Sequence, residues 1–595
     1  MVESTHTLLP RNSIEERLLD STETTPSPPK RRGRGHYWWS AWEATQRNWL
    51  YLHTFPRWLY GPETMADALW TIAYTTLMLA FAVATIPREL PCTRPVIRLL
   101  TLQAFCQCPL IIVLIQKNNI ISFLTGITYQ KLNYLHRASS RVALLFSWVH
   151  FLLWTPSVWN AGHFSHWYII FGLIAIFGFT GLWITSFRFV RRVAFEFFLV
   201  AHIVFTIVFI GGALFHWYRL GFWMWPCFVI WGLDRLIRGS RLLYHNPPPA
   251  FRWSKTKQDE PAGQCEIRLL SQDVMLVTAR RKGLRWAAGQ HFFLSSPGVS
   301  TLPTESHPFS IANVPNEKDE AVFLIRVHSG FTRRLRDRLS GDITTNIPIY
   351  LEGPYGSSHS CASYSTVILV AGGTGITFLF SHLLGLLQAD TPDVPRHVHL
   401  VWHIRHAQDI QWLAPLLKQA STLVQHRLST RLTLDVHVTK SHRADEPAPA
   451  VGLTERLVEE FAPRRFPRHR GSEETGGADE VDLLDEGVED RDDTRALLPK
   501  RRRSTMKQAI GNPNLDSMGL DAQAANLVTW KKGRADLREV LKADLETTTG
   551  PVLVLVCGPV QLMHATRRAV RDVATPQRAL AGDWPVDFFE ETLGS

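Results

Sequence analysis

Two stretches of the sequence decide the fold: HRASSRVALLFSWVH, residues 136–150, and HIVFTIVFIGGALFH, residues 202–216. Each stretch begins and ends with a histidine, and each lies in an apolar run long enough to cross a lipid bilayer. In an α-helix, 14 residues make about four turns and rise about 21 Å, so both histidines of a stretch lie on almost the same helix face. The spacing predicts two membrane helices, each with one histidine near either side of the bilayer.

The four histidines form two ligand pairs if these helices face each other. They are His136, His150, His202 and His216. Two neutral imidazoles are what a haem iron needs when both of its axial positions are filled by the protein. Ionisable side chains at such depth are rare and usually functional, although a single histidine can also serve only to hydrogen-bond a neighbouring helix. The repeated spacing favours ligation of two haem groups.

Hydropathy predicts six membrane-spanning segments in the first half of the chain. They are roughly residues 65–86, 97–116, 136–155, 164–186, 195–217 and 221–238. Basic residues concentrate in FRFVRR, residues 187–192, and RLIRGSR, residues 235–241, so these connections are expected on the cytosolic side. Both termini are then cytosolic. His136 and His202 become the inner pair, and His150 and His216 the outer pair.

Arg141 lies about one turn beyond His136 in the same helix. An arginine in the membrane needs an anionic partner, which a propionate of the inner haem could supply. Alternatively, its long side chain could reach the cytosolic interface. Arg98 and Arg219 are weaker candidates for the same role at the outer haem.

Composition excludes some classes of partner and site. The chain has 595 residues and a net charge of +11, but its basic residues are scattered among loops and tails without a nucleic-acid-binding motif, so no nucleic-acid partner is expected. The seven cysteines show no disulfide framework. Cys106 and Cys108 lie in an apolar helix, where packing in the core is favoured over metal binding.

The first 64 residues are predicted to form a cytosolic N-terminal region without a secretory signal. TPSPPKRRGRG, residues 25–35, is polar, basic and rich in Pro and Gly, which indicates a disordered tail. HYWWSAWEATQRNWLYLHTFPRWLYG, residues 36–61, is rich in Trp and Tyr. This composition is typical of a segment that lies at a membrane interface.

The second half of the chain has two kinds of pattern. Residues 250–360 contain short alternating segments separated by turn residues, which predict an antiparallel β-barrel. Residues 361–595 alternate strands with helices, and the buried strands include residues 398–405, 432–440 and 551–559. This alternation predicts a parallel sheet with a nucleotide site at the carboxyl ends of its strands. The whole chain is therefore expected to be a six-helix membrane domain, residues 65–241, followed by a barrel domain and an α/β domain.

A glycine-rich turn follows the first strand of the predicted α/β domain. It consists of Gly372, Gly373, Thr374, Gly375, Ile376 and Thr377. Glycines permit close approach of the backbone, and the N–H groups of the next helix can bind a pyrophosphate. The same turn could also be only a tight strand–helix connection. A second turn, Cys557-Gly558-Pro559, ends another strand and is expected to face the same crevice.

Two short motifs of the predicted barrel could contact a flavin. In HPFSI, Pro308 and Phe309 supply a rigid apolar surface and Ser310 a hydroxyl. Gly330-Phe331-Thr332 offers a turn with N–H groups and a Thr hydroxyl for phosphate. By composition alone, either motif could be an ordinary barrel turn.

Residues 442–525 have the composition of an insertion. SEETGGADEVDLLDEGVEDRDD is acidic, and a basic stretch that includes Arg501-Arg502-Arg503-Ser504 follows it. Few apolar residues accompany this charge, so the segment is expected to be disordered. The basic stretch could be a kinase site or a plain solvated linker.

Together these motifs resemble the fungal ferric reductases, within the wider ferric reductase/NADPH oxidase superfamily. The resemblance covers about residue 65 to the C-terminus without the insertion, and LTGITYQKLNYLHR, residues 124–137, is similar to the segment that leads into the family's first haem helix. HPFSIAN resembles the family's FAD motif, GGTGIT and CGP its NADPH motifs, and VWHIR, residues 401–405, a further strand of its nucleotide domain. The resemblance implies transmembrane electron transfer from cytosolic NADPH through FAD and two b-type haems.

The resemblance also implies roles for particular residues. Residues 308–310 would hold the isoalloxazine and ribityl of FAD, with His307 structural or a further contact, and Gly330 and Thr332 would lie at its phosphates. Residues 372–377 would hold the NADPH pyrophosphate, and Cys557, Gly558 and Pro559 would lie beside the nicotinamide. Arg534 would bind the 2′-phosphate, since a guanidinium suits a dianion; His403 and Arg405 are weaker candidates for that role.

The chain departs from the family at both ends. The family usually has an aromatic residue a few positions after a pair of glutamates, where Leu593 follows Glu590-Glu591 here; Phe588 or Phe589 could substitute for it. Many members also begin with a signal peptide and an external domain, whereas a short cytosolic tail is expected here.

The acceptor is expected to be ferric or cupric ion, free or bound to a siderophore, reduced at the plasma membrane or another membrane. His163 and His166 could hold such a metal outside, but two histidines without a third ligand are weak evidence, and packing at the interface is the favoured explanation. Two alternatives remain: a superoxide-generating NADPH oxidase, and a non-catalytic membrane cytochrome that serves as a subunit.

Overall fold

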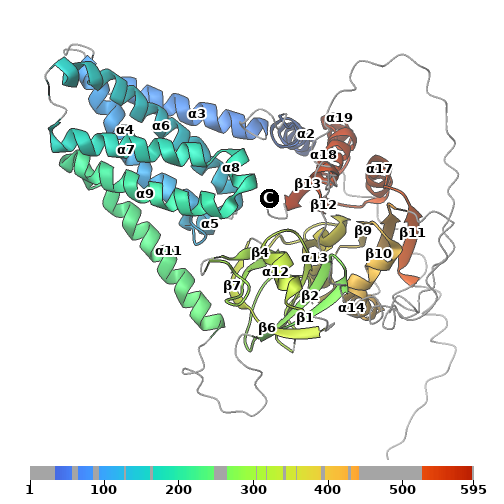
Figure 1. Cartoon of the computed structure of the whole chain (residues 1–595). Helices are drawn as coiled ribbons and strands as arrows, with labels where there is room; N and C mark the ends of the chain where they lie inside the picture. Colours follow the sequence, from blue (N-terminus) through green and yellow to red (C-terminus); the bar gives the residue numbers. More distant parts are fainter. Residues whose placement is uncertain are drawn as a thin grey trace, which may run out of the picture.

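The computed structural model describes residues 34–55, 64–84, 93–125, 127, 129–160, 162, 165–246, 264–302, 305–316, 318–339, 344–356, 358–389, 395–425, 430–440 and 526–591. The predicted N-terminal tail, the acidic insertion, His163 and Leu593 lie outside these residues. A group of long helices stands beside a body of strands and shorter helices, and α11 runs from the first group toward the second (Figure 1).

Each of the six predicted membrane segments contains a long helix. These are α3 (Met65–Ala84), α4 (Thr93–Ile115), α6 (Tyr129–Asn160), α7 (Trp167–Thr185), α9 (Phe195–His216) and α11 (Met224–His245). The short helices α5 (Ile120–Thr125), α8 (Arg188–Val193) and α10 (Tyr218–Gly221) connect them. Within the described residues, three helices are long and apolar enough to cross a membrane: Lys131–Asn160, Trp167–Thr185 and Phe195–His216.

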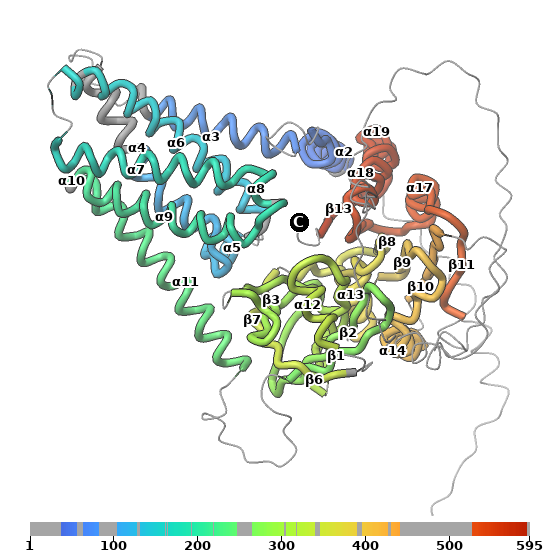
Figure 2. Tube along the Cα trace, in the orientation of Figure 1, coloured from blue at the N-terminus to red at the C-terminus, as the bar shows by residue number. Residues whose placement is uncertain are grey.

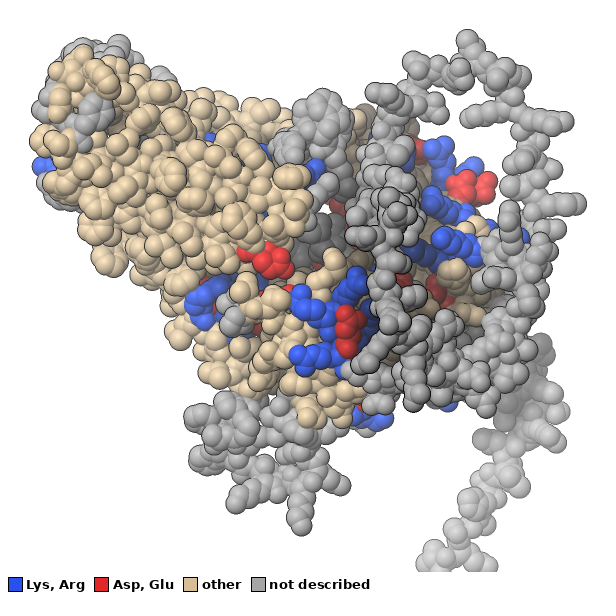
Figure 3. Space-filling view, in the orientation of Figure 1, with Lys and Arg blue, Asp and Glu red and all other residues tan. Residues whose placement is uncertain are grey.

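The outer surface of the helical half suits a lipid environment. Large apolar side chains such as Phe177 and Ile207 are each 66% exposed. Figure 3 shows few charged side chains on the visible face of this half, whereas Lys, Arg, Asp and Glu gather at its junction with the rest of the molecule. An apolar surface of this extent is stable in a bilayer and costly in water.

Small residues let α7 and α9 pack closely. A Cβ at Gly212 of α9 would lie 2.7 Å from the backbone nitrogen of Ala175. A Cβ at Gly178 of α7 would lie 2.8 Å from the backbone nitrogen of Phe209. Membrane helices associate mainly through such close backbone contact, because lipid tails are as apolar as their side chains. The two glycines therefore fix the spacing of the helix that carries His202 and His216.

The strands between residues 264 and 355 form two antiparallel sheets. One sheet has the order β5-β2-β1-β6, and its strands are β1 (Gln264–Ser271), β2 (Val274–Arg280), β5 (Glu320–Arg326) and β6 (Thr344–Pro348). The other has the order β4-β3-β7, with β3 (His291–Ser295), β4 (His307–Ser310) and β7 (Tyr350–Tyr355). A single bridge between Ile311 and Phe323 joins the sheets around one apolar core, and helix α12 (Phe331–Asp337) packs there. The described strands pair as two sheets, and closure into one barrel stays a prediction.

The last part of the chain forms a six-stranded parallel sheet with the order β11-β10-β9-β8-β12-β13. Its strands are β8 (Thr366–Gly372), β9 (His397–Ile404), β10 (Arg431–Val438), β11 (Val528–Lys532), β12 (Val552–Cys557) and β13 (Val586–Glu591). Its helices are α13 (Ile376–Gln388), α14 (Ala414–Gln425), α17 (Leu537–Thr547), α18 (Val560–Val573) and α19 (Pro576–Leu580), with a 3₁₀ turn, η5 (Ala407–Leu413). The parallel sheet is confirmed, while the edge strands β11 and β13 were not predicted.

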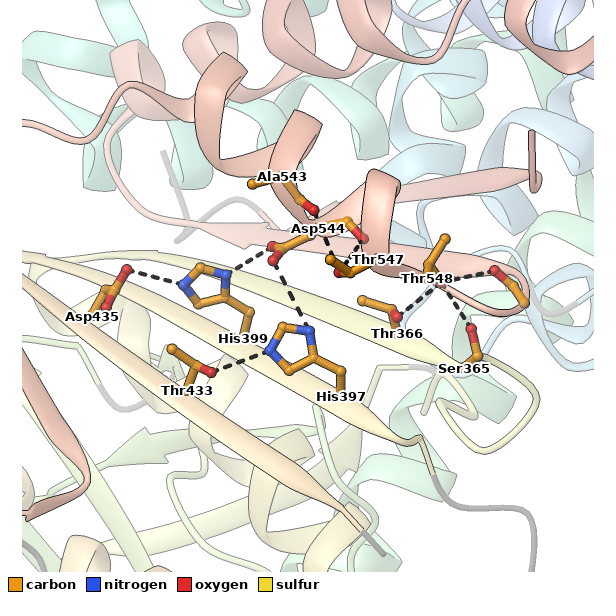
Figure 4. A network of polar contacts seen from close by, with 11 residues as sticks. Ser365, Thr366, His397, His399, Thr433, Asp435, Ala543, Asp544, Thr547 and Thr548 are labelled. Carbon is orange, nitrogen blue, oxygen red and sulfur yellow. Dashed lines mark hydrogen bonds and ion pairs between the residues drawn. The ribbon is translucent and has the colours of Figure 1, made fainter. Parts of the chain in front are cut away.

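A buried charge network fastens the strands on either side of the insertion (Figure 4). His399 of β9 contacts Asp544 of α17 at 2.8 Å and Asp435 of β10 at 3.1 Å, and Lys531 of β11 contacts Asp435 at 2.5 Å. Burial alone would lower the pKa of His399, but hydrogen bonds to both carboxylates outweigh it and raise the pKa to about 9. The imidazolium of His399 therefore links β9 and β10, which precede the insertion, to α17, which follows it. Lys531 adds β11 to this network through Asp435.

We expect His399→Gln to lower the free energy of unfolding by about 3 kcal/mol, because it leaves two largely buried carboxylates without their shared cation. The wild-type contribution should be complete below pH 6.5, the ordinary pKa of histidine, and should disappear as the pH rises through about 9. Denaturant unfolding of the full chain in detergent micelles at several pH values measures this. Lys542→Gln, in an exposed pair with Glu546 on α17, is the control; equal stability of both variants at pH 6 would contradict the assignment.

Candidate functional site

The inner histidine pair lines a large cavity. His136 of α6 and His202 of α9 both contribute to a cavity of about 1320 Å³. Nδ1–H of His136 donates to the carbonyl oxygen of Ile111 at 2.9 Å, which leaves the lone pair of Nε2 for a metal ion. Nδ1 of His202 lies 3.4 Å from Oγ of Ser186. The residues present fit a haem iron held between these two imidazoles.

The outer pair consists of two neighbouring imidazole rings whose planes are nearly perpendicular, at 78°. The ring centres of His150 and His216 are 6.2 Å apart. Two imidazoles bound to opposite sides of one metal ion, each by a bond of about 2 Å, have ring centres about 6 Å apart. Nδ1–H of His216 donates to the carbonyl oxygen of Tyr168 at 2.7 Å, so Nε2 is again available. Gly172 makes room for this ring, since a Cβ there would lie 2.6 Å from Nδ1 of His216.

Arginines surround the inner cavity. Its lining includes Arg137, Arg141, Arg188, Arg191, Arg235 and Arg238. Such a cationic wall suits an anionic group, and a contact between Arg141 and a haem propionate stays a prediction. Of the two weaker candidates, Arg219 lies in α10, and the side chain of Arg98 lies outside the described part of the chain.

The predicted flavin motif forms strand β4 at the edge of the smaller sheet. Pro308 pairs with Phe293, and Ser310 pairs with His291, both of β3. His307 has a structural role: its Nε2 lies 3.1 Å from Oε1 of Glu305, and its ring stacks on Phe331 with centres 5.0 Å apart. The motif is thus a half-buried edge strand, and the ring of its first residue, His307, packs on Phe331 of α12.

The Gly330 turn is present, but its Thr hydroxyl is already used. Gly330 precedes α12 with a φ of 76°, a conformation that favours glycine. The hydroxyl of Thr332 accepts from the backbone N–H of His328 at 2.8 Å and is 8% exposed as a residue. The predicted phosphate contact through this hydroxyl therefore competes with a bond that shapes the turn.

The two predicted nucleotide turns touch each other. A Cβ at Gly375 would lie 2.5 Å from the carbonyl oxygen of Cys557, and a Cβ at Gly558 would lie 2.9 Å from the backbone nitrogen of Gly372. They meet between β8 and β12, where the strand order reverses along the sheet. In open parallel sheets, ligands bind at this position beyond the carboxyl ends of the strands. Of the other residues of these turns, Ile376 and Thr377 are buried, Thr374 is half-buried and Pro559 is exposed.

His403 positions the turn that carries Arg534. Its Nδ1–H donates to the carbonyl oxygen of Ala371, and its Nε2 accepts from the N–H of Ala535, both at 3.2 Å. Burial lowers the pKa of His403 to about 4, so the ring is neutral and can both donate and accept. The exposed Arg405 directly follows β9, and the exposed Arg534 follows β11, which is separated from β9 by β10. His403 thus has a positioning contact that its sequence context did not reveal.

The end of the described chain adds residues that sequence reasoning missed. Glu591 of β13 pairs with Cys557 across the sheet, and burial raises the pKa of its carboxyl to about 7. The ring of Phe589 lies 4.2 Å from that of His359, so one of the two proposed substitutes for the usual aromatic residue is held near the crevice. The apolar pair within VDFFEE was the available signal for this strand.

A largely buried ion cluster joins the membrane helices to the flavin-motif sheet. Arg238 of α11 donates from Nε to Oε1 of Glu352 in β7 at 2.6 Å and from its second nitrogen to Oε2 at 2.8 Å. Lys117, which follows α4, lies 3.6 Å from the same carboxylate and 3.1 Å from the centre of the Phe293 ring. Burial would raise the pKa of Glu352, but the two cations and Tyr355 hold it at about 2. We call Lys117, Arg238 and Glu352 the junction cluster.

We expect Glu352→Gln to destabilise this junction by about 3–5 kcal/mol, because it leaves two poorly solvated cations facing each other. Hydrogen exchange of β7 and of the Lys117 loop should rise in detergent-solubilised full chain. Glu320→Gln removes a more exposed partner of Arg280 and should cost less than about 1 kcal/mol. Unchanged exchange at the junction would show that the cluster does not hold the two parts together.

Comparison with known proteins finds three families along the chain. The family described as "Ferric reductase like transmembrane component" matches residues 100–213, the "FAD-binding domain" family matches residues 261–359, and the "Ferric reductase NAD binding domain" family matches residues 364–571. The matched segments follow one another in the order of the helices, the two antiparallel sheets and the parallel sheet.

Individual relatives are also named as ferric or ferric/cupric reductases. The "Probable cell surface ferric reductase kap2" of Aspergillus oryzae is 30% identical over 53% of this chain and 44% of its own length. The "Ferric/cupric reductase transmembrane component 1" of Candida albicans is 26% identical over 52% of this chain and 40% of its own length. The "Ferric/cupric reductase transmembrane component 2" of Saccharomyces cerevisiae is 23% identical over 82% of this chain and 60% of its own length.

The chain spans about half the length of the curated relatives that it matches. A membrane domain, an FAD-binding domain and an NAD(P)-binding domain follow each other in it. The order of these domains and the similarity to the fungal reductases agree with the motifs of the sequence. Along its membrane, FAD-binding and NAD-binding parts, the chain is thus similar to the fungal ferric reductases.

Proposed function

We propose that the chain transfers electrons from cytosolic NADPH across a membrane and reduces ferric or cupric ions, free or chelated, on the opposite side. One observation carries the proposal furthest. The cavity that contains His136 and His202 is also lined by Arg567 and Glu590 of the nucleotide-binding part. The entrance of the membrane path therefore lies against the part of the chain that would supply electrons.

The groups required are FAD and two haem b, with NADPH as the electron donor. FAD would divide the hydride of NADPH into single electrons, which the haem irons would carry across the membrane. His136 and His202 would hold the inner haem, and His150 and His216 the outer one. With two histidines holding each haem, the chemistry supplied would be electron transfer rather than binding of oxygen at the iron.

The remaining residues bind and orient. Residues 308–310 would provide the flavin surface, and the backbone of the Gly330 turn its phosphate contacts. Residues 372–377 would cradle the NADPH pyrophosphate with backbone N–H groups. Arg534, held in place through His403, would pair with the 2′-phosphate. Residues 557–559 would lie beside the nicotinamide. These roles assign residues 65–241 to the haem groups, 250–360 to FAD and 361–595 to NADPH.

The proposed orientation places both termini and the nucleotide-binding part in the cytosol. The basic connections at 187–192 and 235–241 support it. The names of the relatives, which include a cell surface reductase and ferric/cupric reductases, support metal ions as acceptors and the plasma membrane as the location. On this orientation, His150 and His216 lie on the side where the acceptor is reduced.

We expect His150→Ala to remove one of two haem groups per chain, because the outer iron loses an axial ligand. His216→Ala should have the same effect, while the double variant should lose no more than either single variant. The haem content and the low-spin absorption spectrum of the purified protein measure this. His166→Ala, an exposed histidine near the same side, is the control. Full haem content in the His150 variant would contradict the assignment of His150 as a haem ligand.

We expect Gly375→Ala to weaken NADPH binding by about tenfold or more, because the added Cβ would collide with the Cys557 carbonyl and spread the two turns. Titration of the purified chain with NADP⁺ measures the dissociation constant. Gly239→Ala places its Cβ in open space on α11 and is the control. Equal affinity in both variants would place the nucleotide elsewhere.

The acceptor is tested in proteoliposomes that enclose Fe³⁺-citrate and are supplied with NADPH outside. In vesicles where the nucleotide-binding part of the protein lies outside, we expect NADPH to drive formation of Fe²⁺ inside the vesicle. Little oxygen should be consumed. Superoxide dismutase inside the vesicles should not change the rate. Loss of iron reduction in its presence, with matching oxygen consumption, would instead assign the chain as a superoxide-generating oxidase.

A further inference from the structure

The N-terminal helix has two faces of opposite character. Helix α2 (Arg34–Gln46) continues into a π-helical turn, η1 (Arg47–Tyr51). Trp38, Trp39 and Trp42 are 70%, 60% and 55% exposed, and at 100° per residue they occupy one arc of about 100°. Ala41 and Ala44 lie on the other side and are buried. One face of the helix is therefore aromatic and uncovered, and the other consists of small residues in contact with protein.

The small-residue face is docked on the nucleotide-binding part. Ala41 and Ala44 pack against Ala579 of α19. Arg47 donates to the carbonyl oxygens of Ala574, at 2.7 Å, and of Val586. The side-chain amide of Asn48 also donates to Ala574, at 3.0 Å. These contacts fix the helix, so its tryptophans cannot turn inward without breaking them.

The same segment leads directly into the first membrane helix. Thr54 forms an antiparallel bridge with Thr64, which immediately precedes α3. The backbone N–H of Met65, the first residue of α3, donates to the carbonyl oxygen of His53 at 3.4 Å. Figures 1 and 2 show α2 end-on beside α19, at the end of α3, which itself runs across the view. The aromatic face thus lies where α3 leaves the membrane, turned away from α19.

We propose that the aromatic face of α2 rests in the interfacial layer of the bilayer that α3 enters, and that α2 thereby holds the nucleotide-binding part at the membrane surface. Tryptophan is enriched at this depth because its ring is apolar and its N–H group reaches water or headgroups. A fourth tryptophan, Trp49 of η1, is also 55% exposed. An exposed aromatic patch of this kind is uncommon on a surface that faces only water.

The partner is a lipid surface rather than another protein because the chain itself delivers the helix to the membrane. An interfacial helix buries its apolar face about 5–10 Å below the headgroups, which is within reach of a segment paired with the first residues of a membrane helix. Its opposite face is already occupied by α19. This inference uses only the membrane location of α3 and does not depend on the electron acceptor or on haem.

The full chain in phosphatidylcholine nanodiscs tests the proposal. Trp42→Cys is labelled with an environment-sensitive NBD group, and Lys418→Cys, an exposed position on α14, is the matched control; label on the native cysteines is measured in the unsubstituted chain and subtracted. We expect lipids with a nitroxide near the headgroup to quench residue 42 at least about twofold more than residue 418, and more than lipids with a deep nitroxide. Trp38→Cys provides a second site if the first variant misfolds.

Other results overturn the proposal. Water-like emission at residues 38 and 42, with quenching no greater than at residue 418, would show a face that remains in water. Emission that is shielded in both detergent and nanodiscs but insensitive to nitroxide lipids would assign the face to a protein partner instead.

Discussion

The position of the flavin-motif sheet against the membrane helices depends on a few largely buried charges at the boundary between the lipid-facing and the water-facing parts of the molecule. The membrane helices are built for lipid and the sheets for water, so the two halves share little apolar surface of their own. Arg238 lies in the second half of α11 and Lys117 just beyond α4, and Glu352 of β7 contacts both. A bidentate guanidinium–carboxylate pair fixes direction as well as distance. The junction cluster therefore specifies how the flavin-motif sheet is presented to the inner end of the membrane helices.

Close contacts between specific residues also determine the geometry of the nucleotide-binding part. Gly372, Gly375 and Gly558 allow two turns from different strands to touch through their backbones. Side chains on these residues would separate the turns and widen the crevice between β8 and β12. His403 then ties a third turn to the first through two backbone hydrogen bonds. The site is built from backbone placed by small or neutral residues, which suits a ligand recognised through its phosphates.

Much of this could be predicted from local sequence patterns. Hydropathy located the six long helices, and the strand–turn–helix pattern after residue 365 predicted the parallel sheet and the meeting of its two turns. The edge strands β11 and β13 were not predicted because they are short and carry charged residues, which weakens the apolar pattern typical of a buried strand. The junction cluster also escaped, since Arg238 and Glu352 are 114 residues apart and no local pattern relates them. The contact between α2 and α19 also joins segments that are far apart in the sequence. The tryptophans therefore predicted a segment at the membrane interface, but not its packing on α19.

One contact connects the junction to the membrane path. The carbonyl of Ile111 that accepts the hydrogen bond of His136 belongs to α4, and Lys117 lies two residues beyond the last residue of that helix. A hydrogen bond to the distal nitrogen increases the basicity of a ligating imidazole and so lowers the reduction potential of the metal that it holds. On the proposed ligation by His136, the position of α4, which the junction cluster helps to fix, would therefore influence the reduction potential of the inner haem.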